Sequence, residues 1–133
     1  MDFTVSQILP ALRVADLLLC GFEGGSFGCG YWCRVMDYRE PASLDAAPAE
    51  VRAYPHASYA LTGDGAVVCR LYEEETDEQY TPLVLDRAAV ERGLALMPEK
   101  APGHWSAFLN QQEDATTGDV FIQLCLLGDV VYG

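Results

Sequence analysis

Hydrophobic residues recur at helical spacing in the first part of the chain. Between positions 6 and 20 they return every three or four residues, which is typical of one buried face of a helix. Thr4 or Ser6 is placed to cap this helix. Pro10 is tolerated only in a first turn, so the regular helix is predicted to begin near it. The apolar stripe consists of Ile8, Leu9, Leu12, Ala15, Leu18 and Leu19.

The middle of the chain carries patterns typical of strands. Residues 31–38 alternate between two faces, as a strand does. The turn Gly63-Asp64-Gly65 separates two apolar runs and predicts a β-hairpin, because Asp-Gly is a strong hairpin signal. A loop rich in alanine and proline is expected over 41–52. The predicted strands are 31–38, 57–62, 66–72 and 80–85.

The last third of the chain is predicted to be helical. Asp86 is the expected N-cap of a helix over 87–99, whose buried stripe is Val90, Leu94 and Met97. Pro102-Gly103 ends this helix, and a second, short helix follows over 104–111. A third helix is expected over 118–127, with Thr117 as its cap and Gly128 after its last turn. The apolar tail 129–133 is expected to dock on the body.

This order of elements predicts an α+β fold. We expect an antiparallel sheet of about four strands with helices packed on one face. The chain of 133 residues has the size of one domain, 1–133, and is long enough to bury a single core.

Charge narrows the classes of partner. The net charge is −12, from 20 acidic and 8 basic residues, whereas a magnitude of roughly 2–8 keeps a small domain soluble. No cluster of Lys and Arg exists, so direct binding to nucleic acid or to anionic membranes is not expected. The negative charge instead favours a basic partner, either a nucleic-acid-binding protein or a cation. Five acidic residues form one run: Glu73, Glu74, Glu75, Asp77 and Glu78.

Two interpretations of this acidic run stay open. It is either a solvated loop kept charged for solubility, or part of an anionic face. A basic groove that normally holds nucleic acid would attract such a face quickly and with strong salt dependence.

The glycine-rich stretch 21–30 also has two interpretations. Its glycines follow a helix and precede a strand, with no lysine nearby, unlike a phosphate-binding loop. The stretch is either a helix cap and a tight corner, or one wall of a small-molecule pocket. In the second case Glu23, Tyr31 and Trp32 would line the pocket, where aromatic stacking suits a nucleotide signal.

No arrangement of residues predicts catalysis or a bound metal. Cys29 and Cys33 have the spacing of half a zinc site, but no second pair completes it. His56 and His104 are the only histidines, and no G-x-S-x-G motif accompanies them. We therefore expect no enzyme activity, no metal and no cofactor. No apolar run approaches the roughly eighteen residues of a membrane span and no export signal is convincing, so a cytoplasmic protein is expected.

Several blocks of the chain together resemble a widespread family of small phage- and prophage-borne proteins. The family pairs a Glu-Gly-Gly and Tyr-Trp opening with a Gly-Asp-Val-Val-Tyr-Gly type of ending, and residues 27–29 make the opening of this chain longer than that pattern. The matching blocks are 22–25, 30–32, 85–87, 93–94, 117–123 and 128–133.

The resemblance implies a context rather than a mechanism. Small acidic phage proteins are often anti-defence factors, including anti-CRISPR inhibitors that occupy the nucleic-acid groove of a surveillance complex. The expected function is therefore a non-catalytic anti-CRISPR protein in a bacterial cytoplasm, a DNA mimic that acts as a monomer or small homo-oligomer. A small-molecule binder and a phage accessory domain without a host target are the alternatives.

Overall fold

A three-stranded antiparallel sheet and five α-helices make up the residues that the structure describes, so the fold is α+β. The computed structural model describes residues 1–74 and 79–133. The helices are α1 (Ala11–Glu23), α2 (Pro55–Ser58), α3 (Arg87–Lys100), α4 (Pro102–Leu109) and α5 (Ala115–Leu127). The strands are β1 (Cys33–Arg39), β2 (Ala66–Leu71) and β3 (Leu83–Leu85). Four 3₁₀ turns accompany them: η1 (Gly25–Phe27), η2 (Cys29–Tyr31), η3 (Ala49–Val51) and η4 (Tyr59–Leu61).

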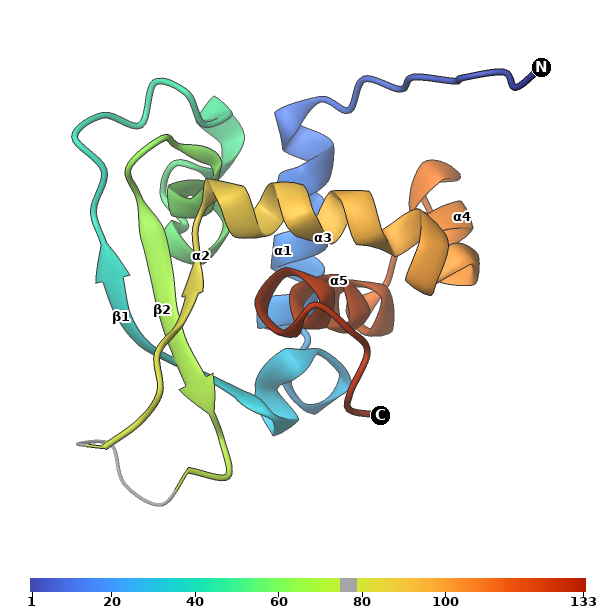
Figure 1. The fold of residues 1–133 in the computed structure, drawn as a ribbon. Coiled ribbons are helices and arrows are strands. Elements are labelled where there is room, and N and C mark those ends of the chain that lie inside the picture. The colour runs from blue at the N-terminus through green and yellow to red at the C-terminus, as the bar shows by residue number, and fades with distance from the viewer. Residues whose placement is uncertain (75–78) are drawn as a thin grey trace.

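Strand β2 forms the centre of the sheet, between β1 and β3. Cys33 pairs with Leu71 at one end of the β1–β2 ladder, and Val67 pairs with Leu85 in the β2–β3 ladder. The central position explains why β2 is buried from its first to its fifth residue. Helices α1, α3, α4 and α5 lie to one side of the sheet, as Figure 1 shows.

The predicted hairpin is wrong in its first strand, 57–62, because residues 57–61 are helical. Pro55 stands in the first turn of α2, where its fixed φ favours a helix. The hydroxyl of Thr62 donates to the carbonyl of Tyr59 at 2.7 Å and accepts from the amide of Gly65 at 2.9 Å. The side chain of Thr62 therefore ends the helical turn, and the glycine-rich turn leads from a helix into β2.

The first helix begins beside Pro10, as predicted, but neither Thr4 nor Ser6 caps it, and it ends later than the sequence pattern predicts. Residues 1–10 have no regular secondary structure, and α1 starts directly after Pro10. At its other end α1 continues through Gly21 to Glu23, so the predicted stop at the start of the glycine-rich stretch is wrong.

Gly21 and Gly118 let α1 and α5 touch backbone to backbone. A Cβ atom on Gly118 would lie 2.2 Å from the amide nitrogen of Gly21, closer than any real contact. A Cβ atom on Gly21 would lie 2.8 Å from the carbonyl oxygen of Gly118. Two glycines of the sequence thus serve close helix packing rather than a turn or a phosphate site.

The helices of the last third follow the sequence pattern closely. Asp86 caps α3 by accepting a hydrogen bond from the amide of Ala89 at 2.9 Å, as predicted. Helix α5 ends at Gly128, whose φ of 75° is left-handed, also as predicted. Its N-cap is Asp114 rather than Thr117, because the Asp114 carboxylate accepts from the Thr117 amide at 2.9 Å.

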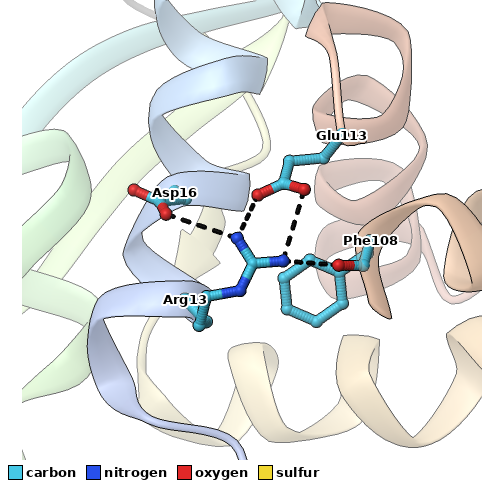
Figure 2. Close-up of polar contacts among 4 residues, drawn as sticks. All are labelled: Arg13, Asp16, Phe108 and Glu113. Atoms are coloured by element: carbon cyan, nitrogen blue, oxygen red, sulfur yellow. Dashed lines mark hydrogen bonds and ion pairs between the residues drawn. The ribbon is translucent and has the colours of Figure 1, made fainter. Parts of the chain in front are cut away.

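Arg13 ties α1 to the connection between α4 and α5 (Figure 2). Its guanidinium donates to both carboxylate oxygens of Glu113 and to the carbonyl oxygen of Phe108. Asp16 accepts a further, longer bond at 3.5 Å. The guanidinium carbon also lies 4.6 Å from the centre of the Phe108 ring, a cation–π contact. The ion pair with Glu113 holds the pKa of Arg13 above its ordinary value.

Candidate functional site

The acidic run begins where β2 ends, and the structure describes its first two members. Glu73 is exposed, and its carboxylate accepts a hydrogen bond from the phenol of Tyr132 at 3.2 Å. Glu75, Asp77 and Glu78 lie outside the described residues. Glu73 is therefore the described carboxylate of the run that is open to a partner.

Glu74 has a structural role. Both of its carboxylate oxygens accept from the amide of Thr81, at 3.0 and 3.2 Å. Its carbonyl oxygen accepts from the guanidinium of Arg70 at 3.1 Å. These bonds fasten the two sides of the connection between β2 and β3, so Glu74 is half-buried rather than freely presented.

The three residues of the predicted pocket are not gathered around one ligand space. Glu23 lies at the end of α1, where its carboxylate is 3.3 Å from the Nε2 atom of His56. Tyr31 and Trp32 instead point their polar atoms at a residue of α5, Asp119. The structure thus joins the two aromatic residues and places Glu23 with His56.

Asp119 is a buried carboxylate that the sequence analysis did not single out. Only 5% of its surface is exposed. It accepts hydrogen bonds from the Tyr31 phenol at 2.7 Å, from the Trp32 indole at 2.6 Å and from the Gln123 amide at 3.2 Å. Three donors to one buried carboxylate fix the orientation of both aromatic rings.

Gln123 fastens the tail 129–133 one helical turn further along α5. Its side-chain oxygen accepts from the amides of Val131 and Tyr132, both at 2.8 Å. Its side-chain nitrogen donates to the carbonyl oxygen of Tyr132 at 3.2 Å. The predicted docking of the tail is confirmed, and a fully buried glutamine provides it.

The docked tail places Tyr132 between the predicted pocket residue Trp32 and the acidic-run residue Glu73. Its ring stacks on the indole of Trp32, and its hydroxyl donates to Glu73. Tyr72 joins them around a crevice of about 90 Å³ lined by Tyr31, Trp32, Tyr72, Glu73 and Tyr132. The aromatic corner and the start of the acidic run are therefore one surface. We call Tyr31, Tyr72, Glu73 and Tyr132 the tyrosine face.

The tyrosine face is accessible to a partner. The exposed fraction is 59% for Tyr72 and 41% for Tyr31. Phe27 and Val131, at 78% and 62%, extend the exposed apolar surface beside it. Exposed aromatic residues are enriched at protein-binding surfaces, and the carboxylate of Glu73 adds a group that can pair with a basic side chain.

A larger open cavity adjoins the tyrosine face. Its volume is about 630 Å³, and Tyr31, Asp119 and Tyr132 form one wall of it. Lys100 and His104 contribute cationic or ionisable groups from the junction between α3 and α4. Its size lies within the range that binds small ligands, about 300–1,000 Å³.

His104 is held by the N-terminal turn of α5. The Thr117 hydroxyl donates its single proton to Asp114 at 3.0 Å, so it accepts from Nδ1 of His104 at 3.3 Å. This arrangement supports the helix rather than activating a nucleophile, since the carboxylate is already the cap of α5.

The thiols of Cys29 and Cys125 lie inside the core and are poor nucleophiles. The hydrogen bond with Cys33 and then burial raise the pKa of the Cys29 thiol far above its ordinary value. Burial also raises the pKa of Cys125. Both thiols therefore stay protonated and unreactive near neutral pH. Across residues 1–74 and 79–133, no group of three His, Cys, Asp or Glu side chains is arranged to hold a metal ion.

No helix within the described ranges has both the length and the apolar character that crossing a membrane requires. Comparisons of the chain with models of protein families, with curated proteins and with solved structures found no match.

Proposed function

We propose that this protein binds a basic, nucleic-acid-binding protein through the tyrosine face and the acidic run that follows it. One observation carries the proposal: the exposed carboxylate of Glu73 stands among Tyr31, Tyr72 and Tyr132 in one crevice. The net charge of −12 directs such a surface toward lysine and arginine side chains of a partner.

The chemistry of the face suits arginine in particular. An arginine guanidinium can pair with the carboxylate of Glu73 and stack on the ring of Tyr72 or Tyr31. Tyrosine and arginine are also the residue types that most often dominate binding energy at protein interfaces. Grooves that hold nucleic acid are lined with arginine and lysine, so they offer the matching surface.

The tyrosine face is also preorganised. Asp119 fixes Tyr31, and the stacking on Trp32 together with the bond to Glu73 fixes Tyr132. Side chains that are already held lose less conformational entropy on binding, which favours affinity.

The resemblance to phage-borne proteins narrows the proposal to an anti-defence function. In that form the partner is a CRISPR surveillance complex, and the bound protein covers the basic groove that receives target DNA. Inhibition then needs no chemical step, only occupancy of the groove and repulsion of phosphate by the acidic run.

A gel-shift assay tests this proposal. Guide-loaded CRISPR effectors are incubated with target DNA and increasing amounts of the wild-type protein or of a variant. We expect the wild type to reduce DNA binding, with a weaker effect at higher salt. The double variant Tyr72→Ala/Glu73→Lys should need at least tenfold more protein for the same effect.

A matched control is available outside the tyrosine face. Glu50 of η3 and Tyr54, which precedes α2, are also exposed, and neither lines the crevice beside Glu73. The variant Tyr54→Ala/Glu50→Lys makes the same change in charge and aromatic content and should inhibit like the wild type. Equal inhibition by the Tyr72→Ala/Glu73→Lys variant and the wild type would refute the proposed face.

A second candidate function is favoured by the cavity beside Tyr31. A volume of about 630 Å³ next to Lys100 and His104 suits a small anionic ligand such as a nucleotide signal. Calorimetry with cyclic nucleotides separates the two functions. Saturable binding that is insensitive to salt and is lost in Lys100→Ala would favour the small-molecule binder over the protein inhibitor.

A further inference from the structure

The segment 1–10, here called the arm, displays apolar side chains that the rest of the chain does not cover. The exposed fraction is 91% for Phe3, 91% for Val5 and 94% for Ile8, and Met1 is equally open. Figure 1 shows the arm leaving the start of α1 in an extended form and running away from the sheet. Large apolar side chains that are fully exposed and close together usually mark an interaction surface.

An apolar groove lies at the root of the arm. It has a volume of about 430 Å³ and runs between α1, η4 and the first half of α3. Gln7 and Leu9 of the arm form its rim. Its apolar lining includes Val14, Leu61, Val90, Leu94, Ala95 and Trp105.

We propose that two copies of this chain form a dimer in which the arm of each copy lies in the apolar groove of the other. In a dimer with a two-fold axis, each arm lies in the groove of the other copy. The exchange therefore covers the apolar side chains of both arms and the lining of both grooves. This proposal concerns a different surface from the tyrosine face and does not depend on the function proposed for that face.

The area available matches that of a stable interface. Burial of a Met, Phe, Val or Ile side chain removes about 60–120 Å² of apolar surface from water. Four such side chains on each of two arms remove about 500–1,000 Å². The two grooves lose a smaller area, because each exposes only a narrow lining. The total of roughly 1,000 Å² reaches the area of about 1,000 Å² that a specific protein interface needs.

Charge also favours this contact between two acidic chains. The arm carries one charged side chain, Asp2, although the chain as a whole has a net charge of −12. The groove carries one charge of each sign, Arg87 and Glu91, which pair with each other at 3.2 Å. Copies that meet through arm and groove therefore avoid most of their mutual repulsion.

Analytical ultracentrifugation over a range of protein concentrations tests the dimer. We expect the wild type to dimerise more strongly as salt rises, because salt screens the repulsion between acidic copies. The arm variant Phe3→Asp/Val5→Asp should weaken dimerisation at least tenfold. The groove variant Ala95→Glu should do the same, whereas Ala88→Glu, an exposed position of α3 outside the groove, should not.

Mixing the two disruptive variants shows whether the arm is exchanged. The arm of the Ala95→Glu chain and the groove of the Phe3→Asp/Val5→Asp chain are both intact, so a mixture should recover part of the dimer. A wild type that stays monomeric at high protein concentration and high salt would overturn the proposal. Dimers that survive both variants would overturn it as well, since another surface would then hold them.

The same measurements separate this proposal from the proposed function. The variant Tyr72→Ala/Glu73→Lys should dimerise normally although it no longer inhibits. The salt dependences also have opposite signs, because binding to a basic partner weakens with salt and dimerisation strengthens.

Discussion

Tyr132 stacks on the indole of Trp32, with ring centres 5.5 Å apart and ring planes 9° from parallel. This contact places the tail over a buried side chain that is itself bonded to Asp119. The exposed tyrosine face is therefore continuous with the hydrogen bonds of the core, and changes inside α5 should alter the surface.

The first prediction concerns Gln123, the residue that holds the tail. Replacement by leucine keeps the volume but removes the bonds to the amides of Val131 and Tyr132. We expect a loss of about 1–3 kcal/mol in the free energy of unfolding, the usual cost of unsatisfied buried groups. Urea unfolding gives this value, and hydrogen exchange of the two tail amides should accelerate.

The variant Gln123→Glu provides the comparison. It keeps an oxygen acceptor for the tail amides but places a second carboxylate beside Asp119, so it should destabilise at neutral pH and recover as pH falls. Tail amides that exchange at the wild-type rate in Gln123→Leu would contradict the assigned role.

The second prediction concerns the titration of Tyr31. Burial, followed by the hydrogen bond to the Asp119 carboxylate, raises the pKa of Tyr31 to about 12. Because the folded pKa lies above the unfolded value of about 10, the stabilisation is complete below pH 10 and is lost as pH rises through the folded pKa. Absorbance at 295 nm, compared between the wild type and Tyr31→Phe, isolates this titration.

In Asp119→Asn the negative charge beside the phenol is gone, so the Tyr31 titration should move toward the ordinary tyrosine value. A Tyr31 titration that is the same in the wild type and in this variant would show that the carboxylate does not act on the phenol.

The third prediction concerns Asp114, the N-cap of α5. Its bond from the amide of Thr117 holds the pKa of its carboxyl below the ordinary value. The stabilisation is therefore present above the unfolded pKa and is lost as pH falls through the folded pKa. We expect Asp114→Ala to cost about 1 kcal/mol at neutral pH and less in acid. Chemical unfolding at several pH values measures the difference.

Asn is the matched replacement at this position, since its side-chain oxygen can cap a helix without charge. Asp114→Asn should retain most of the stability at neutral pH and lose the pH dependence of the cap. An alanine variant as stable as the wild type at pH 7 would exclude a capping role.

The fourth prediction concerns the crossing of α1 and α5. Gly118→Ala places a methyl group where the backbone of Gly21 lies, so the helices must separate. Overpacking of this kind costs about 1–3 kcal/mol. Thermal unfolding should show a lower midpoint.

Gly103→Ala is the control for that substitution. Gly103 also lies in a helix, α4, but a Cβ atom there meets nothing within 4 Å. This variant should be neutral or more stable by up to about 1 kcal/mol, since alanine favours helices over glycine. A Gly118→Ala protein as stable as Gly103→Ala would mean that the helices can move apart freely.

The sequence pattern predicts the elements whose signals are local. Asp86 and Gly128 bound α3 and α5 because capping depends on residues within one turn. The same local reasoning fails at 57–62, where Pro55 and the Thr62 hydroxyl favour a helix over the predicted strand. Apolar content alone did not distinguish the two.

The site depends on contacts between distant segments. The sequence therefore predicted some of its residues but not that they lie together. Glu73 and Tyr31 were both predicted as site residues, but no spacing rule joins position 73 to position 31. One signal was available in the sequence: Asp119 and Gln123 stand four residues apart in an apolar helix. Polar side chains in such a place need buried partners, and here those partners are Trp32 and the tail.

The Arg13–Glu113 pair joins residues 100 positions apart in the chain. Such a contact forms only after a long stretch of backbone has been brought into order, because loop closure precedes the gain from the contact. We therefore expect the docking of α1 against α5 to be a late step in folding, because it depends on residues from both ends of the chain.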